Sequence, residues 1–156
     1  MVLHAHPPTL RWIGEVDGIL ALLDQTRLPG DVVEISCRTV EDVWQAIRRL
    51  AVRGAPAIGV AAAYGVCLAL RDGPGNPQAA VETACAHLAS SRPTAVNLLW
   101  ALERMRRVAN SCSDANRDQC ARRLLAEARR IHEEDRAMCA AIGRHGANAM
   151  CDLPEG

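Results

Sequence analysis

The stretch Arg53-Gly54-Ala55-Pro56-Ala57-Ile58-Gly59 decides how this chain folds, because it joins the end of one helix to the start of another. Upstream, apolar residues recur at helical spacing, and Thr39 with Asp42 three positions later is typical of a helix N-terminus. Gly54 suits the left-handed residue just past this first helix, and Pro56 suits the first turn of the next. The sequence therefore predicts a tight corner between two helices.

The start of the second helix is also a candidate anion site. Its free backbone N–H groups and the positive end of its dipole point toward whatever lies beside Arg53. A guanidinium beside such N–H groups is a good receptor for phosphate. An ordinary corner with a solvated arginine is the alternative, and the residues alone leave both interpretations open.

A second junction repeats this arrangement. Ser90-Ser91-Arg92-Pro93-Thr94 precedes another apolar stripe at helical spacing, so Arg92 stands just ahead of a helix that we expect Pro93 to initiate. Arg53 and Arg92 would clamp one phosphorylated ligand if the fold brings the two junctions together. Their separation in the sequence does not decide this.

Both junctions resemble motifs of one family. Arg53 to Gly59, continuing through Val60-Ala61-Ala62-Ala63-Tyr64-Gly65, resembles the signature of the methylthioribose-1-phosphate isomerases, aldose–ketose isomerases of methionine salvage. The segment from Ser91 to Leu98 resembles the second N-terminal motif of that family, and the likeness extends over nearly all of residues 9–150. Ribose-1,5-bisphosphate isomerases and the regulatory subunits of the eukaryotic initiation-factor nucleotide exchanger share the fold. The wording Arg-Gly-Ala-Pro and Ser-Arg-Pro-Thr favours the methylthioribose branch.

The resemblance implies a division of labour within the family. Arg53, Gly54, Ala55 and Arg92 match positions that bind the sugar phosphate, and the reaction uses neither a metal nor an organic cofactor. The catalytic cysteine of the family lies in a Thr-His-Cys-Asn segment, and the catalytic aspartate lies in a Rossmann-like C-terminal domain. No Thr-His-Cys occurs here. We therefore expect no catalytic residue in this chain, no activity from it alone, and either a homodimer in a full-length form or a C-terminal partner segment.

Charge and hydropathy exclude two classes of partner. The 18 basic residues are all arginine, 18 acidic residues balance them, and no basic stripe is interleaved with aromatic residues. This argues against a nucleic-acid-binding protein. The longest uncharged run, residues 54–70, is shorter than the ~20 residues that cross a bilayer. We expect it to be a helix buried on all sides, in which glycine and alanine allow close packing.

The seven cysteines indicate the compartment and one further alternative. Their odd number, without a Cys-x-x-Cys pair or a secretory signal, fits buried thiols in a reducing cytoplasm. A zinc site at His132, Cys139, His145 and Cys151 is conceivable, but these spacings match no zinc-finger pattern. We therefore predict no metal.

The remaining pattern predicts an α+β fold, with a small antiparallel sheet followed by a helical bundle and a long connector helix. Strands are expected at Leu10–Ile13, Ile19–Leu23 and Val32–Ile35, and helices near 40–52, 56–70, 78–89, 94–109 and Asp114–Ala147. Asn76 is expected to cap the third of these helices and Pro77 to start it. Residues 1–8 are expected to be a loose tail, 9–113 the N-terminal isomerase domain, 114–150 the connector helix, and 151–156 the truncated start of a missing C-terminal domain. The apolar face of the connector helix is expected at Leu124, Ala128, Ile131, Met138 and Ile142.

Overall fold

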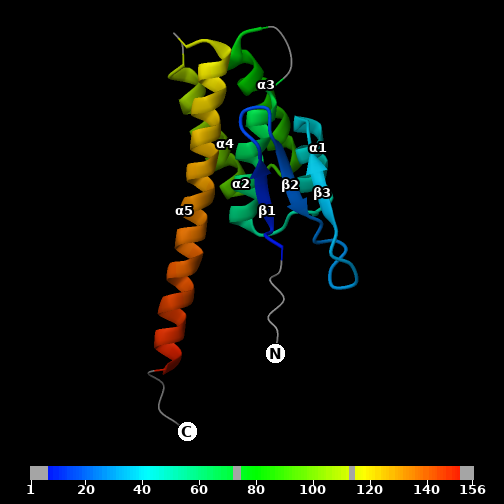
Figure 1. Ribbon diagram of the computed structural model, residues 1–156, viewed down its shortest axis with the longest axis vertical. Coiled ribbons are helices and arrows are strands. Elements are labelled where there is room, and N and C mark those ends of the chain that lie inside the picture. The colour runs from blue at the N-terminus through cyan, green and yellow to red at the C-terminus, as the bar shows by residue number, and fades with distance from the viewer. Residues whose placement is uncertain (1–6, 72–74, 113–114, 152–156) are drawn as a thin grey trace.

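The computed structural model describes residues 7–71, 75–112 and 115–151 (Figure 1). The predicted α+β order is confirmed, since three strands precede five helices. Most of the predicted tail (1–8) and of the final segment (151–156) lies outside the described residues, as does the predicted start of the connector helix at Asp114. The strands are β1 (Leu10–Ile13), β2 (Ile19–Leu23) and β3 (Glu34–Cys37); the helices are α1 (Val40–Arg48), α2 (Ala55–Leu68), α3 (Pro77–Ser91), α4 (Val96–Asn110) and α5 (Arg117–Cys151).

The sheet is antiparallel in the order β1-β2-β3. Leu22 of the central strand pairs with Leu10 on one side and Ile35 on the other. The prediction that the third strand begins at Val32 is wrong, because the ladder starts at Glu34 and continues to Cys37. Val32 is 62% exposed, so two consecutive valines do not mark a buried strand here.

Helix α1 begins as predicted and ends earlier than predicted. Thr39 and Asp42 form a reciprocal capping box at its start. At its end, Leu50 has φ 63°, and the amides of Leu50 and Ala51 donate to the carbonyls of Ile47 and Ala46. These are the two hydrogen bonds of a Schellman motif. The left-handed residue just past the helix is therefore Leu50, and the prediction that gave this place to Gly54 is wrong.

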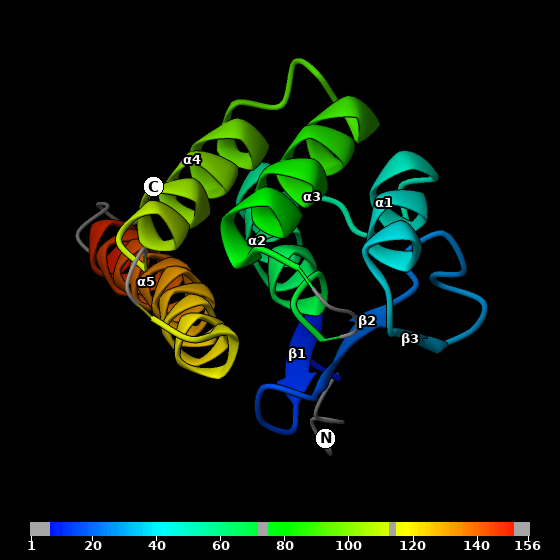
Figure 2. The ribbon, with the colours of Figure 1, turned by 90° about the horizontal axis from the view of Figure 1, so that it is seen from above.

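Helix α2 lies at the centre of the molecule, as Figure 2 shows. It contacts β1, β2 and all four other helices. Every residue from Ile58 to Leu68 is buried, which confirms the prediction of a helix enclosed on all sides. Glycines make this possible: a Cβ on Gly65 would lie 3.1 Å from Val43 Cγ1 and 3.2 Å from Leu88 Cδ1.

Two of the last three helices, α3 and α5, begin at clear capping signals. Asn76 accepts from the amides of Gln78 and Ala79 and caps α3, whose first residue is Pro77, as predicted. Asn116 caps α5 by accepting from the amide of Gln119, whose side chain accepts from the amide of Asn116 in return. This reciprocal pair explains why α5 begins at Arg117.

Only the first half of α5 packs against the body. Its buried residues run from Cys120 to Ile131, whereas Met138 is 62% and Ile142 66% exposed. The predicted apolar face is therefore covered in its first half and open in its second. In Figure 1 the orange and red end of α5 continues past the other helices. None of the described helices combines the length and apolar character needed to span a bilayer.

Candidate functional site

The structure brings the starts of α2 and α4 together. A Cβ built on Gly59 would lie only 2.7 Å from the backbone oxygen of Asn97, so the two helices touch near their first turns. Neither helix has a side-chain cap or an acidic residue in its first turn. The positive ends of two helix dipoles therefore lie side by side without a protein anion at either cap.

Gly54 is the N-cap of α2, with φ 89° and ψ 128°. Only glycine adopts such a backbone without strain. Its carbonyl accepts the first helical hydrogen bond from the amide of Ile58, while Pro56 in the first turn has no amide to donate. A ligand at this start would therefore meet the amide of Ala55.

Arg53 is exposed, and its Nε donates to the carbonyl of Leu50 at 3.2 Å. Arg92 is half-buried and forms the C-cap of α3. Among the ion pairs of the described residues, neither guanidinium has a carboxylate partner. Both charges therefore remain available to an anion.

The expectation that Pro93 initiates the next helix is wrong. Residues 93 and 94 form a turn, the amide of Ala95 donates to the carbonyl of Arg92 at 3.0 Å, and α4 begins at Val96. Arg92 thus lies one turn before the helix and not directly at its start. The junction is a proline turn followed by a helix whose N-cap, Ala95, has no side-chain acceptor.

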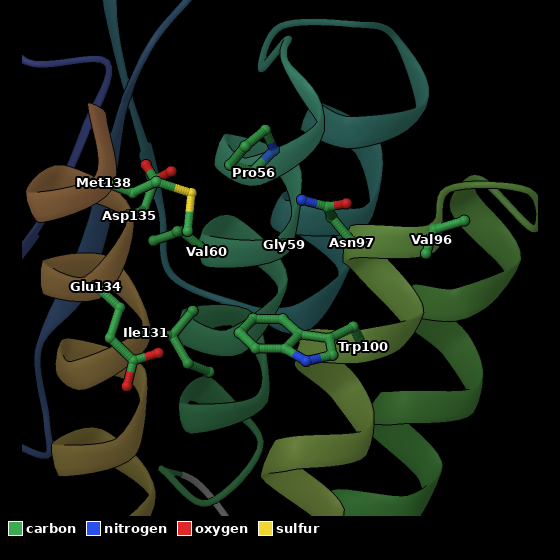
Figure 3. A pocket seen from close by; sticks show the side chains of 10 residues that line it. All are labelled: Pro56, Gly59, Val60, Val96, Asn97, Trp100, Ile131, Glu134, Asp135 and Met138. Atoms are coloured by element: carbon green, nitrogen blue, oxygen red, sulfur yellow. The ribbon is translucent and has the colours of Figure 1, made fainter. Parts of the chain in front are cut away.

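A pocket of about 370 Å³ lies next to these helix starts, between α2, α4 and α5. In Figure 3, Asn97 extends from α4 toward Pro56 of α2, and the indole of Trp100 extends between the two helices. Neither Arg53 nor Arg92 lines it. Its lining is Pro56, Gly59, Val60, Val96, Asn97, Trp100, Ile131, Glu134, Asp135 and Met138.

The carboxylate of Glu134 on the pocket wall forms an ion pair with Arg104. The hydrogen bond from Arg104 is the main cause that lowers the pKa of Glu134, and the positive charges of Arg104 and Arg130 lower it further. Arg104 also donates to the buried Glu127 at 2.7 Å and lies 4.8 Å above the ring of Trp100. The lining is therefore mainly apolar, and its polar members besides the paired Glu134 are Asn97 and Asp135.

The sequence predicts the two junctions but not the pocket. Its lining comes from three helices that are far apart in the sequence, and no local motif connects them. One signal was present: Trp100 lies off the buried stripe of α4, which includes Leu98 and Leu102, and it is 48% exposed. The four groups considered for zinc all lie along α5, and within the described part of the chain no three potential ligands gather.

Two curated relatives match most of the chain. It is 49% identical over 140 residues to a 5-deoxyribose 1-phosphate isomerase of Moorella thermoacetica, which covers 87% of this chain and 40% of that protein. It is also 49% identical over 138 residues to a methylthioribose-1-phosphate isomerase of Rhodopirellula baltica, which covers 85% of this chain and 38% of that protein. The chain thus spans about two fifths of the length of these relatives.

Two solved structures share the fold of this chain. A 5-methylthioribose 1-phosphate isomerase of Pyrococcus horikoshii superimposes with a TM-score of 0.84 at 33% identity, over 96% of this chain and 42% of that one. The delta subunit of translation initiation factor eIF-2B from A. fulgidus gives 0.71 at 38% identity, over 81% of this chain and 37% of that one. The α+β unit is therefore one shared by sugar-phosphate isomerases and a translation-factor subunit. Residues 51–153 match the Initiation factor 2 subunit family, and the chain belongs to this family.

Proposed function

We propose that this chain is the N-terminal, substrate-phosphate-binding part of a methylthioribose-1-phosphate isomerase. The observation that carries the proposal is the pair of adjacent, uncapped helix starts, each preceded by an arginine without a carboxylate partner among the described residues. Arg53 with the amides of Gly54 and Ala55 holds the phosphate, and Arg92 adds a second charge-assisted contact. The relatives named as isomerases support this assignment.

The reaction would convert 5-methylthioribose 1-phosphate into 5-methylthioribulose 1-phosphate by moving hydrogen from C2 to C1 after ring opening. A carboxylic acid protonates the ring oxygen and a thiolate acts as the base. We assign both groups to the part of the relatives that this chain does not span. The proposed reaction uses neither a metal nor an organic cofactor. The role of this chain is to position the sugar phosphate.

The same proposal covers organisation and location. Residues 9–113 form the substrate-binding domain and 114–150 the connector helix that leads toward a catalytic domain. The full-length form is a cytoplasmic homodimer of methionine salvage. By this proposal the 156-residue chain alone does not turn over the sugar phosphate. Turnover by the purified chain above the level of an Arg53→Ala variant would contradict this part.

Phosphate binding is the first test. We expect inorganic phosphate at millimolar concentration to shift the amide resonances of Gly54, Ala55 and Val96 saturably. Arg53→Ala and Arg92→Ala should each weaken the affinity about tenfold, since a charge-assisted hydrogen bond contributes roughly 1.5–3 kcal/mol. Arg48→Ala is the matched control, because it removes one exposed arginine from α1 and should leave the affinity unchanged. Equal effects of Arg48→Ala and Arg53→Ala would reduce the site to general charge attraction.

One alternative has its own support. The likeness to the eIF-2B delta subunit favours a non-catalytic interaction module. In that case partner binding should survive the double replacement of Arg53 and Arg92, and the shifts above should be absent. Half of a ribose-1,5-bisphosphate isomerase would instead bind a bisphosphorylated sugar more tightly than a monophosphorylated one.

A further inference from the structure

The pocket between α2, α4 and α5 has a polar end and an apolar end. Near the starts of the two shorter helices, Asn97 extends toward Pro56, and Asp135 of α5 lies at this end of the lining (Figure 3). Roughly 4.5 Å further along α4, at the rise of an α-helix, the indole of Trp100 points toward Ile131. The polar end therefore adjoins the helix starts, and the apolar end lies about one turn beyond it.

The charges on the lining do not suit a phosphate. The lining contains two carboxylates, Glu134 and Asp135, and no arginine. Arg104, which contacts Glu134, also pairs with Glu127, so its charge is already compensated. A phosphate beside these carboxylates is repelled. A phosphorylated ligand must therefore keep its phosphate at the helix starts and direct its other end into the pocket.

The apolar end suits a thioether. Trp100 is 48% and Met138 62% exposed, so both present apolar surface that a ligand can cover. The guanidinium of Arg104 lies 4.8 Å from the centre of the Trp100 ring, an interaction that restrains the indole. Sulfur makes favourable contacts with aromatic rings. The volume of about 370 Å³ lies within the range of roughly 300–1,000 Å³ that is typical of small-molecule sites.

We propose that this pocket is the specificity site for the 5-substituent of the sugar phosphate, and that Trp100 selects a methylthio group over the methyl group of a 5-deoxy sugar. The inference rests on the proposed function, because the phosphate at the helix starts anchors the ligand. The relatives do not decide between the two sugars, since one is named for 5-deoxyribose 1-phosphate and another, equally similar at 49% identity, for methylthioribose 1-phosphate. Asn97 and Asp135 lie between anchor and apolar end, where they can bind the sugar hydroxyls.

Ligand titration of the purified chain, followed by NMR, tests the assignment. The ligands are 5-methylthioribose 1-phosphate, 5-deoxyribose 1-phosphate and inorganic phosphate, and the probes are the amides of Gly54 and Ala55 and the indole N–H of Trp100. We expect the methylthio compound to bind about tenfold more tightly than the 5-deoxy compound, because its extra sulfur and methyl group become buried against the indole. The indole resonance should move with the methylthio compound and stay in place with inorganic phosphate.

Variants assign the preference to one side chain. Trp100→Ala should remove most of it, with the fold checked by circular dichroism. Leu99→Ala is the matched control, because Leu99 is the exposed neighbour on α4 that does not line the pocket, and this variant should keep the preference. Met138→Ala changes an exposed lining residue of α5 and should reduce the preference without disturbing the core.

Failure of this inference differs from failure of the proposed function. If inorganic phosphate shifts Gly54 and Ala55 but the two sugar phosphates bind equally well, the pocket assignment is overturned and the phosphate site stands. If none of the three ligands shifts these amides, the proposed function fails and the inference falls with it. Equal loss of the preference in Leu99→Ala and Trp100→Ala would overturn the role of Trp100. The comparison of the two sugar phosphates needs only the wild-type chain, so it holds even if a variant does not fold.

Discussion

Leu50 adopts a backbone conformation that L-residues avoid. Its φ of 63° places it in the left-handed region, where Cβ approaches the following carbonyl at a cost of roughly 1–2 kcal/mol. Its side chain is 42% exposed, so burial offsets little of that cost. The two hydrogen bonds that end α1 hold the conformation in place.

Replacing Leu50 by glycine should therefore stabilise the chain. We expect Leu50→Gly to raise the free energy of unfolding by about 0.5–1 kcal/mol, because glycine fits the left-handed C′ position of the Schellman motif. Urea unfolding of the purified chain measures this. Leu50→Ala is the control, since it shortens the same side chain and keeps Cβ; it should give no gain. A loss of stability in Leu50→Gly would mean that the leucine side chain contributes more than its exposure suggests.

At the scale of elements, α2 and α4 approach so closely that their first turns leave no room for a side chain at Gly59. A Cβ there would lie 2.7 Å from Asn97 O and 3.5 Å from Ala101 Cβ. The neighbour at 2.7 Å is backbone, so rotating a side chain cannot relieve the contact. This approach also forms one wall of the pocket.

Gly59→Ala should separate the two helices or fail to fold. We expect a loss of about 3 kcal/mol in the free energy of unfolding, at the upper end of overpacking costs. Gly143→Ala is the matched control, because no atom lies within 4 Å of its Cβ position on α5. That control should change stability little or raise it by up to about 1 kcal/mol. Thermal unfolding followed by circular dichroism compares the two; equal midpoints would contradict the close contact.

Elements with local start signals could be predicted from the sequence. Thr39 with Asp42 and Asn76 with Pro77 carry their caps within a few residues, and both helices begin where predicted. The start of β3 depends on partners in β2, and the end of α1 depends on a leucine in a conformation that favours glycine. Such features depend on tertiary contacts, which override local preference.

The candidate site follows the same rule. The two arginine junctions stand out in the sequence because glycine and proline mark them, whereas their adjacency requires the contact between Gly59 and Asn97. Pro93 is typical of a helix start, but the chain turns there and α4 begins at Val96. The apolar pocket could not be predicted from the sequence, because α5 forms its third wall and only the tertiary fold places α5 there.

At the scale of the whole molecule, one aromatic cluster connects sheet, central helix and long helix. Trp12 of β1 stacks on Tyr64 of α2 at 5.4 Å, and the Tyr64 hydroxyl lies 3.2 Å from Nδ1 of His132 on α5. Burial raises the pKa of Tyr64 to about 12, so its hydroxyl keeps its proton. It donates to Nδ1 when the imidazole is neutral and carries its proton on the other nitrogen.

This cluster predicts a pH dependence of stability. Burial is the main cause that lowers the pKa of His132, followed by the charge of Arg136; Asp135 and Glu133 act weakly in the opposite direction. The unfolded chain, with a histidine pKa of ~6.5, therefore binds the proton more readily. Stability should fall as the pH drops below that value, and the fall should end once the pH is below the lower pKa of the folded state.

Urea unfolding at pH 7.5 and 5.5 measures this effect. We expect the wild-type chain to lose more stability between these two values than His132→Gln does. His87 on α3, which pairs with Glu41 outside this cluster, is the control position, and His87→Gln should keep the contribution of His132. Identical pH slopes in the wild type and His132→Gln would exclude the mechanism.

The unequal burial along α5 separates two thermodynamic regimes within one continuous helix. A helix of this kind rarely forms alone over a dozen residues, because the first turn is costly to nucleate. The buried turns up to Ile131 provide that nucleus, and the exposed turns that follow grow from it one hydrogen bond at a time. The far end of α5 therefore behaves as a helix–coil system attached to a folded body: its order is set by propensity and temperature and declines gradually with distance from the anchor.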